Sequence, residues 1–479
     1  MKVNNKAKLI RREIFRHLGE MLIKETPFSE TDRIPIKMRP KNQASIRCCI
    51  YRDRAVIRHK TMAMLGFDTN IEQDELKPLG EYFQESLNTA QPDDNILTVT
   101  HEACSSCKKA NYVVTNMCRG CVGQSCMLNC PKDAIAFIGN QAKILEDKCV
   151  NCGLCQKVCP YHSIIYSPVP CEEVCPVDAI QKDAHGKEVI DIEKCIFCGK
   201  CIESCPYGAI VEKSHLFNII NKIKQKKKMI AMVAPSIGGQ FRENMEKIMG
   251  SLIKLGFSEV YEVAMGADIT AKAEANEFME KAGEGLSMTT SCCPAYVNFI
   301  DKHAPDLKPY VSTTHSPMEY TAQYLREQHP EKELVFISPC IGKKDEASRS
   351  ENIDYVINFE EFGAWLIAAG IEISECEDYS VKENISSHAR GFAWNGGVSQ
   401  AVAVHLPALD FENIQFNGIE RRFERQLKTV LKSSKPALVE VMSCEGGCLG
   451  GCSSIVNEKA GRRQLEKFIG SLRVATETV

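Results

Sequence analysis

Cysteine spacing is the feature of this 479-residue chain that most directly implies chemistry. Eight of its 25 cysteines fall in two runs of the form C-x2-C-x2-C-x3-C-P. Such a run wraps a cubane [4Fe–4S] cluster: three thiolates on one loop hold three irons, and the cysteine before the proline reaches the neighbouring cluster. The chain is therefore expected to bind several clusters and to move electrons. The eight residues are Cys149, Cys152, Cys155, Cys159, Cys195, Cys198, Cys201 and Cys205.

A third, less regular run and a half run extend this pattern. All four units end in a similar phrase (CPKDAI, CPYHSI, CPVDAI and CPYGAI), so they read as four copies of one unit, or two ferredoxin-like pairs. Because the fourth cysteine crosses over within a pair, the spacing predicts three ligand sets. These are Cys118, Cys121, Cys126 with Cys159; Cys149, Cys152, Cys155 with Cys130; and Cys195, Cys198, Cys201 with Cys175.

The residues of a possible fourth ligand set lie farther apart in the sequence. Cys171 and Cys205 remain and need two more ligands, and Cys104-x2-Cys107 is the only spare C-x2-C upstream. Sixteen cysteines would then hold four cubanes with none left over. The alternative is that Cys104 and Cys107 bind zinc or no metal. Disulfides are disfavoured, because the chain shows no secretory segment and no membrane-spanning stretch and reads as cytoplasmic, where thiols stay reduced.

A second group of cysteines lies beyond residue 213. Three short motifs carry it: TSCCP at 290–294, SPCIGKKDE at 338–346 and EVMSCEGGC at 440–448. A single cysteine of this kind would most often be a buried structural residue. Together, however, the motifs supply four well-separated thiolates on loops, which predicts a further cluster in a different domain. The four are Cys293, Cys340, Cys444 and Cys448, and Gly446 and Gly447 would let the backbone approach a large ligand.

The elements around these motifs indicate an α/β domain. Short apolar runs at 229–233, 334–337 and 438–442 alternate with amphipathic stretches such as 271–281 and 318–328, a pattern typical of a mostly parallel sheet. Each apolar run ends at unusual residues, and the carboxyl ends of parallel strands are where such domains place their sites. The candidate cofactor-binding residues there include Ala234, Pro235 and Ser236.

The chain is thus expected to have three parts: a small basic domain of unknown role at 1–100, α+β ferredoxin-like domains at 101–213 and the α/β domain at 214–479. The first part is expected to hold about one helix, over 8–24, followed by a basic segment with Cys48 and Cys49. Residues 1–60 contain 16 Lys and Arg against six Asp and Glu, although the whole chain has a net charge of −3. Nucleic-acid binding is one interpretation. We favour docking of this basic segment on the acidic remainder of the chain or on an acidic redox partner, with no nucleic-acid or membrane partner.

The three motifs beyond residue 213 resemble the signature of the [FeFe]-hydrogenases, in that family's order. The resemblance runs from about Met229 to the C-terminus, and the family's ferredoxin-like extension accounts for 101–213. It implies reversible conversion of H2 into protons and electrons at an H-cluster, a cubane joined to a diiron subcluster with CO, cyanide and a dithiolate amine. By position, Cys293, Cys340, Cys444 and Cys448 would hold the cubane, with Cys448 bridging to the diiron unit. Cys292 would pass protons, and Lys343 would pair with a cyanide.

The resemblance also implies a proton relay. Glu274 and Glu277 stand three residues apart, which places them on one helix face. Together with Ser312 they match the family's glutamate–serine–glutamate relay leading to the thiol. Taken alone, two carboxylates on a helix would more often be solvated surface groups. The position of these two in the sequence, shortly before the TSCCP motif, favours the relay.

Four departures from the family pattern make this a divergent member. Tyr296 stands where a Trp is usual, Ser338 where a Met is common, Met318 where a glutamine is common, and Cys452 interrupts a run of glycines. These changes are expected to alter the reduction potential of the H-cluster, the rate of turnover and the preference for H2 oxidation or evolution. A ferredoxin-like redox partner and maturation proteins for the diiron site are the implied partners.

Two other functions fit part of the sequence. One is a non-catalytic iron–sulfur assembly factor resembling the Narf-like relatives. The other is a polyferredoxin or redox sensor with a degenerate H-cluster domain. Cys292, Lys343 and both glutamates favour the enzyme, because a scaffold does not need them.

Overall fold

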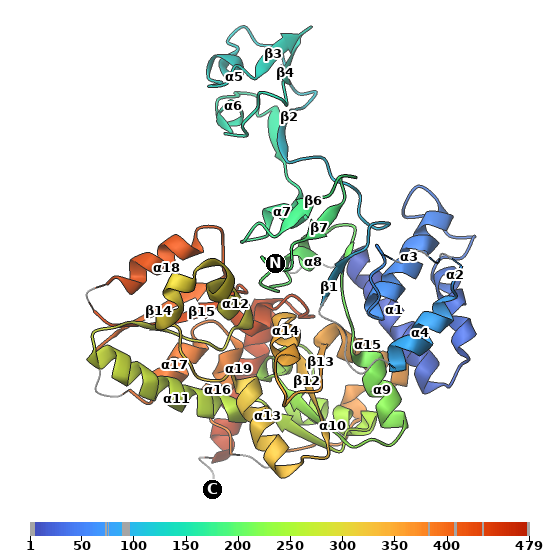
Figure 1. Cartoon of the computed structure of the whole chain (residues 1–479), viewed down its shortest axis with the longest axis vertical. Coiled ribbons are helices and arrows are strands. Elements are labelled where there is room, and N and C mark those ends of the chain that lie inside the picture. The colour runs from blue at the N-terminus through green and yellow to red at the C-terminus, as the bar shows by residue number, and fades with distance from the viewer. Residues whose placement is uncertain are drawn as a thin grey trace.

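The computed structural model describes residues 5–71, 74, 76–88, 96–381, 384–406, 410–433 and 435–476, with side chains to residue 470. Figure 1 shows a helical N-terminal region, two small cysteine-rich lobes and a larger α/β region that carries the C-terminus. Among the described residues, no helix combines the length and the apolar character needed to cross a bilayer.

The α/β region is built on two sheets whose strand pairs are all parallel in the described part of the chain. The predicted apolar runs coincide with β9, β12 and β15, and β9 is buried along its whole length, as a central parallel strand should be. The prediction of a parallel α/β fold is therefore confirmed. The first sheet has the order β10 (Glu259–Glu262), β9 (Met229–Val233), β12 (Glu333–Ser338), β13 (Tyr355–Asn358); the second has the order β11 (Met288–Thr289), β15 (Ala437–Met442), β14 (Glu412–Asn417).

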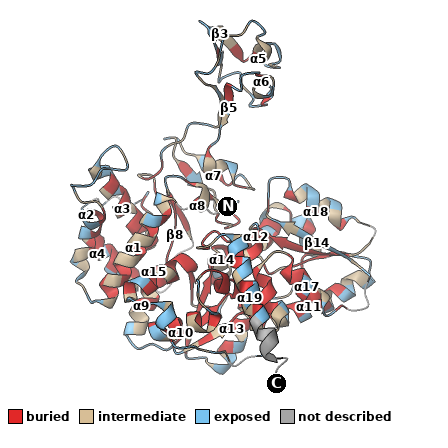
Figure 2. Ribbon diagram, turned by 180° about the vertical axis from the view of Figure 1, so that it is seen from behind, coloured by how far each residue is buried: buried red, intermediate tan, exposed pale blue. Residues whose placement is uncertain are grey.

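Helices cover these sheets, and Figure 2 shows the buried strands beneath helices whose outer faces are exposed. α15 begins with a capping box, in which Asn358 and Glu361 satisfy each other's backbone N–H groups. The helices are α9 (Leu216–Lys224), α10 (Met245–Leu255), α11 (Ala264–Gly283), α12 (Pro294–His303), α13 (Pro317–Gln328), α14 (Gly342–Ser348), α15 (Phe359–Ala369), α16 (Ser387–Arg390), α17 (Gly397–Ala403), α18 (Phe423–Leu431) and α19 (Glu458–Thr476).

The expectation of about one helix in residues 1–100 was wrong. The structure has α1 (Lys6–Ile23), α2 (Ile34–Met38), α3 (Ile50–Met64) and α4 (Leu79–Asn88). In α3 the apolar residues are scattered among basic ones, and the basic side chains instead reach backbone carbonyls: Arg54 donates to Arg39 and Lys60 to Tyr207. Tertiary contacts of this kind stabilise a helix whose own sequence pattern is weak.

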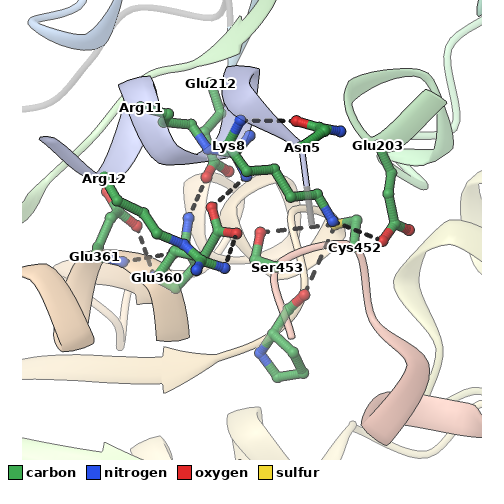
Figure 3. Close-up of polar contacts among 12 residues, drawn as sticks. Asn5, Lys8, Arg11, Arg12, Glu203, Glu212, Glu360, Glu361, Cys452 and Ser453 are labelled. Atoms are coloured by element: carbon green, nitrogen blue, oxygen red, sulfur yellow. Dashed lines mark hydrogen bonds and ion pairs between the residues drawn. The ribbon is translucent and has the colours of Figure 1, made fainter. Parts of the chain in front are cut away.

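The N-terminal helices share a core with the α/β region. The Phe217 ring of α9 lies 6.2 Å from the ring of Phe15 and 5.6 Å from that of Phe83. Figure 3 shows ion pairs at the same junction: Arg11 and Arg12 of α1 both contact Glu360 of α15. These contacts agree with the interpretation that the basic segment docks on the chain's own acidic groups.

The cysteine-rich region forms two lobes. Lobe one (residues 110–168) stands away from the rest, and lobe two (residues 96–109 and 169–213) lies between it and the α/β region. In lobe two, β1 pairs antiparallel with β8, so the chain before residue 100 contributes a strand to it. Lobe one holds β2 (Asn111–Val114), α5 (Ser125–Leu128), β3 (Ile135–Ile138), β4 (Gln141–Ile144), α6 (Leu154–Lys157) and β5 (Ile164–Ser167); lobe two holds β1 (Leu97–Val99), α7 (Pro170–Glu173), β6 (Ile180–Lys182), β7 (Glu188–Ile190), α8 (Lys200–Ser204) and β8 (Ile210–Glu212).

Candidate functional site

A cavity lies where the loops after strands of both sheets meet. The loops follow β9 and β12 of the first sheet and β11 and β15 of the second, so every motif sits at the carboxyl end of a parallel strand. Five motif cysteines line the cavity, together with the other candidate cofactor-binding residues. These are Cys292, Cys293, Cys340, Cys444, Cys448, Lys343, Ala234, Pro235 and Ser236.

Local structure explains how two of the cysteine loops are shaped. Cys293 is the N-cap of α12, and Pro294 occupies its first turn, where a missing N–H costs nothing. Gly446 and Gly447 adopt φ values of +80° and +73°, and a Cβ on Gly447 would come within 2.7 Å of the backbone nitrogen of Asn395. The two glycines are thus required by backbone conformation and close packing, a reason that the sequence interpretation did not include.

The cavity fits an anionic group with hydrogen-bond acceptors. Lys343 is the one charged side chain that lines it, and the hydroxyls of Ser236 and Ser443 are buried there without a partner among the described residues. Buried hydroxyls normally have partners, and a buried ammonium binds anions strongly. The Lys343 ammonium also donates to Ser316 Oγ at 2.9 Å and to Glu346 Oε2 at 2.6 Å. Thiols beside these donors suit iron coordination.

Burial keeps the motif thiols protonated in the protein itself. It raises the pKa values of Cys340 and Cys444 well above the ordinary thiol value and that of Cys448 to about 11. The Lys343 ammonium opposes this effect at Cys448. A metal must therefore displace these protons when it binds, so loading of the site is coupled to proton release.

The two relay glutamates both lie on α11 and are joined by hydroxyl groups. Ser312 Oγ donates to Glu277 at 2.7 Å and lies 2.9 Å from Thr314 Oγ1. Ser291 Oγ lies 3.4 Å from Thr314 Oγ1 and 3.4 Å from Glu274 Oε1. Thr314 and Ser291 are links that sequence reasoning missed, although both lie within two residues of a residue that it named.

Glu274 and the neighbouring thiol have strongly perturbed acidities. Burial raises the pKa of Glu274 to about 8, against the hydrogen bonds from Ser291. Burial, reinforced by Glu274, raises the pKa of Cys292 well above the thiol value. Towards the surface, Glu277 pairs with Lys281 at 3.1 Å. The arrangement runs from a buried thiol to a partly exposed carboxylate.

In lobe one the structure brings the cysteines together as two sets. Each set lines a small cavity and includes one cysteine from the other unit, the crossover arrangement. None of the 25 cysteines forms a disulfide bond. Among the described residues, no three His, Cys, Asp or Glu are arranged around a single metal ion; ligands of a cubane stand around four irons. The sets are Cys118, Cys121, Cys126, Cys159 and Cys130, Cys149, Cys152, Cys155.

In lobe two, the thiols of Cys198, Cys195, Cys175 and Cys171 all act electrostatically on the Cys201 thiol. Cys104, Cys171 and Cys205 lie in the same buried cluster as Cys175, Cys195 and Cys201, and Cys107 packs against it. The Cys205 thiol acts electrostatically on both Cys107 and Cys171, so these residues are neighbours, and the fourth ligand set stays a prediction. Besides Cys292 and Cys452, three cysteines stand outside the proposed ligand sets. Cys48 and Cys49 are exposed before α3, and the buried thiol of Cys376 donates to the carbonyl of Glu372.

Lobe two adjoins the cavity through Cys452. Its sulfur packs on the backbone of Gly199, where a Cβ would lie 2.5 Å away, and donates to the carbonyl of Pro339 at 3.7 Å. An open groove beside it is lined by Cys175 and Cys198 of lobe two and by Cys444. Cysteines of the two regions are therefore near neighbours.

Comparisons with known proteins agree with these motifs. Residues 227–452 match the family model for the C-terminal domain of the iron only hydrogenase large subunit. Residues 165–216 match the LdpA Fe–S cluster-binding domain and residues 142–165 a 4Fe–4S binding domain. In solved structures, a variant of the [FeFe]-hydrogenase HydA1 from Chlamydomonas reinhardtii is similar at 21% identity and a TM-score of 0.42, over 53% of this chain and 88% of that one.

Curated relatives include enzymes and assembly factors. The chain is 26% identical to iron hydrogenase 1 of Clostridium pasteurianum, over 69% of this chain and 68% of that protein. It is 29% identical to the periplasmic [Fe] hydrogenase large subunit of Nitratidesulfovibrio vulgaris, over 64% and 85%. It is also 22% identical to cytosolic iron-sulfur assembly component 3 of Rattus norvegicus, over 51% and 66%. The chain is thus a divergent relative of the iron-only, or [FeFe], hydrogenases: residues 227–452 belong to the family of their C-terminal domain, and iron–sulfur cluster-binding domains precede them.

Proposed function

We propose that this protein is an [FeFe]-hydrogenase that interconverts H2 with protons and electrons at an H-cluster. The observation that supports it most is the position of Cys292. This thiol lines the cavity among the four candidate ligands, and Ser291, the residue before it, hydrogen-bonds the buried Glu274. A cluster scaffold has no use for a titratable path that leads from its site towards the surface.

The residues that line the cavity would have distinct roles in cluster binding and proton transfer. Cys293, Cys340, Cys444 and Cys448 would hold the H-cluster, which when bound supplies the metal site and the electrons for H2 chemistry. Lys343, Ser236 and the neighbouring Ala234 and Pro235 would face its anionic ligands. Cys292 would carry a proton at Sγ, and Glu274 would carry the next at its carboxyl group, because both groups hold protons at neutral pH.

Electrons would pass through four [4Fe–4S] clusters. Lobe one would hold two of them, and lobe two would hold two more beside the active cavity. The proximity of Cys198 and Cys444 along one groove supports transfer between lobe two and the H-cluster. A ferredoxin or similar cytoplasmic redox protein would supply or accept the electrons, and maturation proteins would install the diiron unit.

Infrared spectroscopy of the matured protein tests this proposal. CO and cyanide bands are expected, since the diiron unit carries these ligands and [4Fe–4S] clusters do not. Cys292→Ala should keep the bands but lower turnover by about 10²- to 10⁴-fold, the contribution of a positioned proton carrier. Cys293→Ala, its neighbour, should instead lower the iron content. Near-normal H2 turnover in Cys292→Ala would show that protons enter elsewhere.

The second candidate is an iron–sulfur assembly factor, which the match to cytosolic iron-sulfur assembly component 3 favours. In that case the matured protein would show cubane clusters without CO and cyanide bands. The same result would leave open the polyferredoxin or redox-sensor interpretation, which electron transfer without H2 turnover would distinguish from the assembly factor.

A further inference from the structure

Lys60 of α3 is a buried lysine that has no carboxylate partner among the residues that the structure describes. Its side chain is 3% exposed, and within the described part of the chain no Asp or Glu lies at ion-pair distance from it. Its ammonium donates to the carbonyl of Tyr207 at 3.2 Å. The ammonium packs against the turn that follows Cys205. A Cβ on Gly208 in that turn would lie only 2.9 Å from Lys60 Nζ.

The other charges around Lys60 are mostly of its own sign. Arg47 donates to the carbonyls of Tyr207 and Ala103, at 3.4 and 3.5 Å, so it faces the backbone beside both Cys205 and Cys104. Burial lowers the pKa of Lys60 to about 7, and repulsion from Arg47 contributes to this shift. The Cys205 thiol acts in the opposite direction and raises the pKa of Lys60. Arg47 itself has Asp53 at 4.0 Å.

This arrangement differs from the other contacts of the N-terminal helices. Figure 3 shows Lys8 directed at Glu203, at 3.0 Å, and Arg11 and Arg12 directed at Glu360. Each of those cations is balanced by a carboxylate of the body. A buried ammonium that lacks such a partner is strongly destabilised, so another negative charge is expected at Lys60.

We propose that Lys60, assisted by Arg47, is the counter-charge of a cubane cluster held by Cys104, Cys107, Cys171 and Cys205. The proposal rests on the fourth cluster of the proposed function. A cubane with four thiolate ligands is an anion whose reduction potential depends on nearby charge and on solvent exposure. The N-terminal helices would thereby raise the potential of this cluster and favour its reduced form.

The test uses the full-length protein, reconstituted with iron and sulfide but without the diiron unit, and redox titration followed by EPR. The fourth cluster is identified as the signal that Cys171→Ala removes. Lys60→Met should lower the midpoint potential of the fourth cluster by about 59 mV, for a one-electron couple. At the wild-type midpoint potential, the ratio of reduced to oxidised cluster would then fall about tenfold. Lys60→Arg keeps the charge and should titrate like wild type. The exposed Lys37→Met, on the same helical region, is the matched control and should leave every midpoint unchanged.

An unchanged midpoint in Lys60→Met, with the cluster still present, would overturn the proposal, as would an equal shift in Lys60→Arg. If Lys60→Met does not fold, Arg47→Gln replaces it and should give a smaller shift of the same sign; no shift there would also refute the proposal. Because no diiron unit is installed, the result is independent of H2 turnover. If the wild-type protein lacks a signal that depends on Cys171, no fourth cluster is present and this proposal fails. The hydrogenase proposal would not be affected by that result.

Discussion

Lobes one and two carry related cysteine units but differ in what surrounds them. In lobe one, Cys152 is exposed, and apolar side chains such as Val122 and Leu128 are 101% and 76% exposed. In lobe two, Cys171, Cys195 and Cys205 are buried beneath the N-terminal helices and the α/β region. A ligand motif therefore specifies a cluster, whereas the neighbouring elements specify the environment in which that cluster works.

The difference is visible in the thiol acidities. Burial raises the pKa of Cys195 to about 11 and those of Cys198 and Cys171 to about 12. In lobe one, burial also raises the pKa values of Cys126 and Cys155, whereas burial of Cys159 is outweighed by hydrogen bonds, chiefly from Ser163, and its pKa is lowered. Charges act more strongly where water is excluded. We therefore expect single charges such as Lys60 to affect cluster potentials most in lobe two, and we expect a redox partner to exchange electrons at lobe one.

The largest expected effect is the loss of a lobe-two ligand. Cys198→Ala should reduce H2 evolution to the assay background with both a reduced viologen dye and a protein donor, because every path from the surface clusters passes this lobe. Cys152→Ala, in lobe one, should slow the reaction with the protein donor and spare the reaction with dye. Equal losses in the two variants would contradict the division of roles between the lobes.

The same contrast between buried and exposed groups applies to the relay glutamates. Glu274→Gln should lower turnover by about 10²-fold, because a buried proton carrier cannot be replaced by solvent. Glu277→Gln should have a smaller effect, since its side chain is 15% exposed and water can reach it. Steady-state H2 evolution at pH 7 measures both. A larger loss in Glu277→Gln would place the critical carboxylate at the surface end.

Stability should also depend on pH through Glu274. Its folded pKa of about 8 lies above the ordinary value of 4.5, so the folded state holds a proton that the unfolded chain releases between these values. Stability must therefore fall as pH rises from about 4.5 to 8. Glu274→Gln should flatten this part of the thermal-midpoint profile. A profile that keeps the wild-type slope would mean that another group causes the fall.

Excision of lobe one is expected to have a moderate effect. Asn111 and Ser167 are paired across the antiparallel strands β2 and β5, so a short turn can join them in place of residues 112–166. Dye-driven turnover should persist while turnover with a protein donor falls. If both reactions survive unchanged, electrons enter at lobe two and lobe one is dispensable.

The smallest effect concerns packing. Ile196 of lobe two is 1% exposed in a core with Tyr296 and Phe299, and Ile196→Ala should cost about 2–5 kcal/mol. Ile138 of lobe one is 61% exposed, and Ile138→Ala should stay within about 0.5 kcal/mol. Thermal unfolding of the reconstituted protein measures both. Similar values would imply that lobe two is not packed as tightly as the structure indicates.

Local spacing made much of this architecture predictable. The apolar runs became β9, β12 and β15, and the cysteine runs of lobe one surround two cavities in the crossed-over arrangement. The N-terminal helices escaped prediction because α3 depends on contacts such as that of Lys60 with Tyr207, more than 100 residues away. The hydroxyl links Thr314 and Ser291 escaped because single hydroxyl residues carry no spacing signal.

The sequence by itself determined the chemistry available to this protein: thiolates at ligand spacing, glycines at tight turns and carboxylates on one helix face, all properties of short segments. Only the tertiary structure decided which of these groups are buried. Among the described residues, it buried Lys60 with no carboxylate at ion-pair distance and within electrostatic reach of Cys205, and it left Cys152 exposed. Desolvation and Coulombic interaction depend on distances across the fold, and sequence separation does not encode those distances.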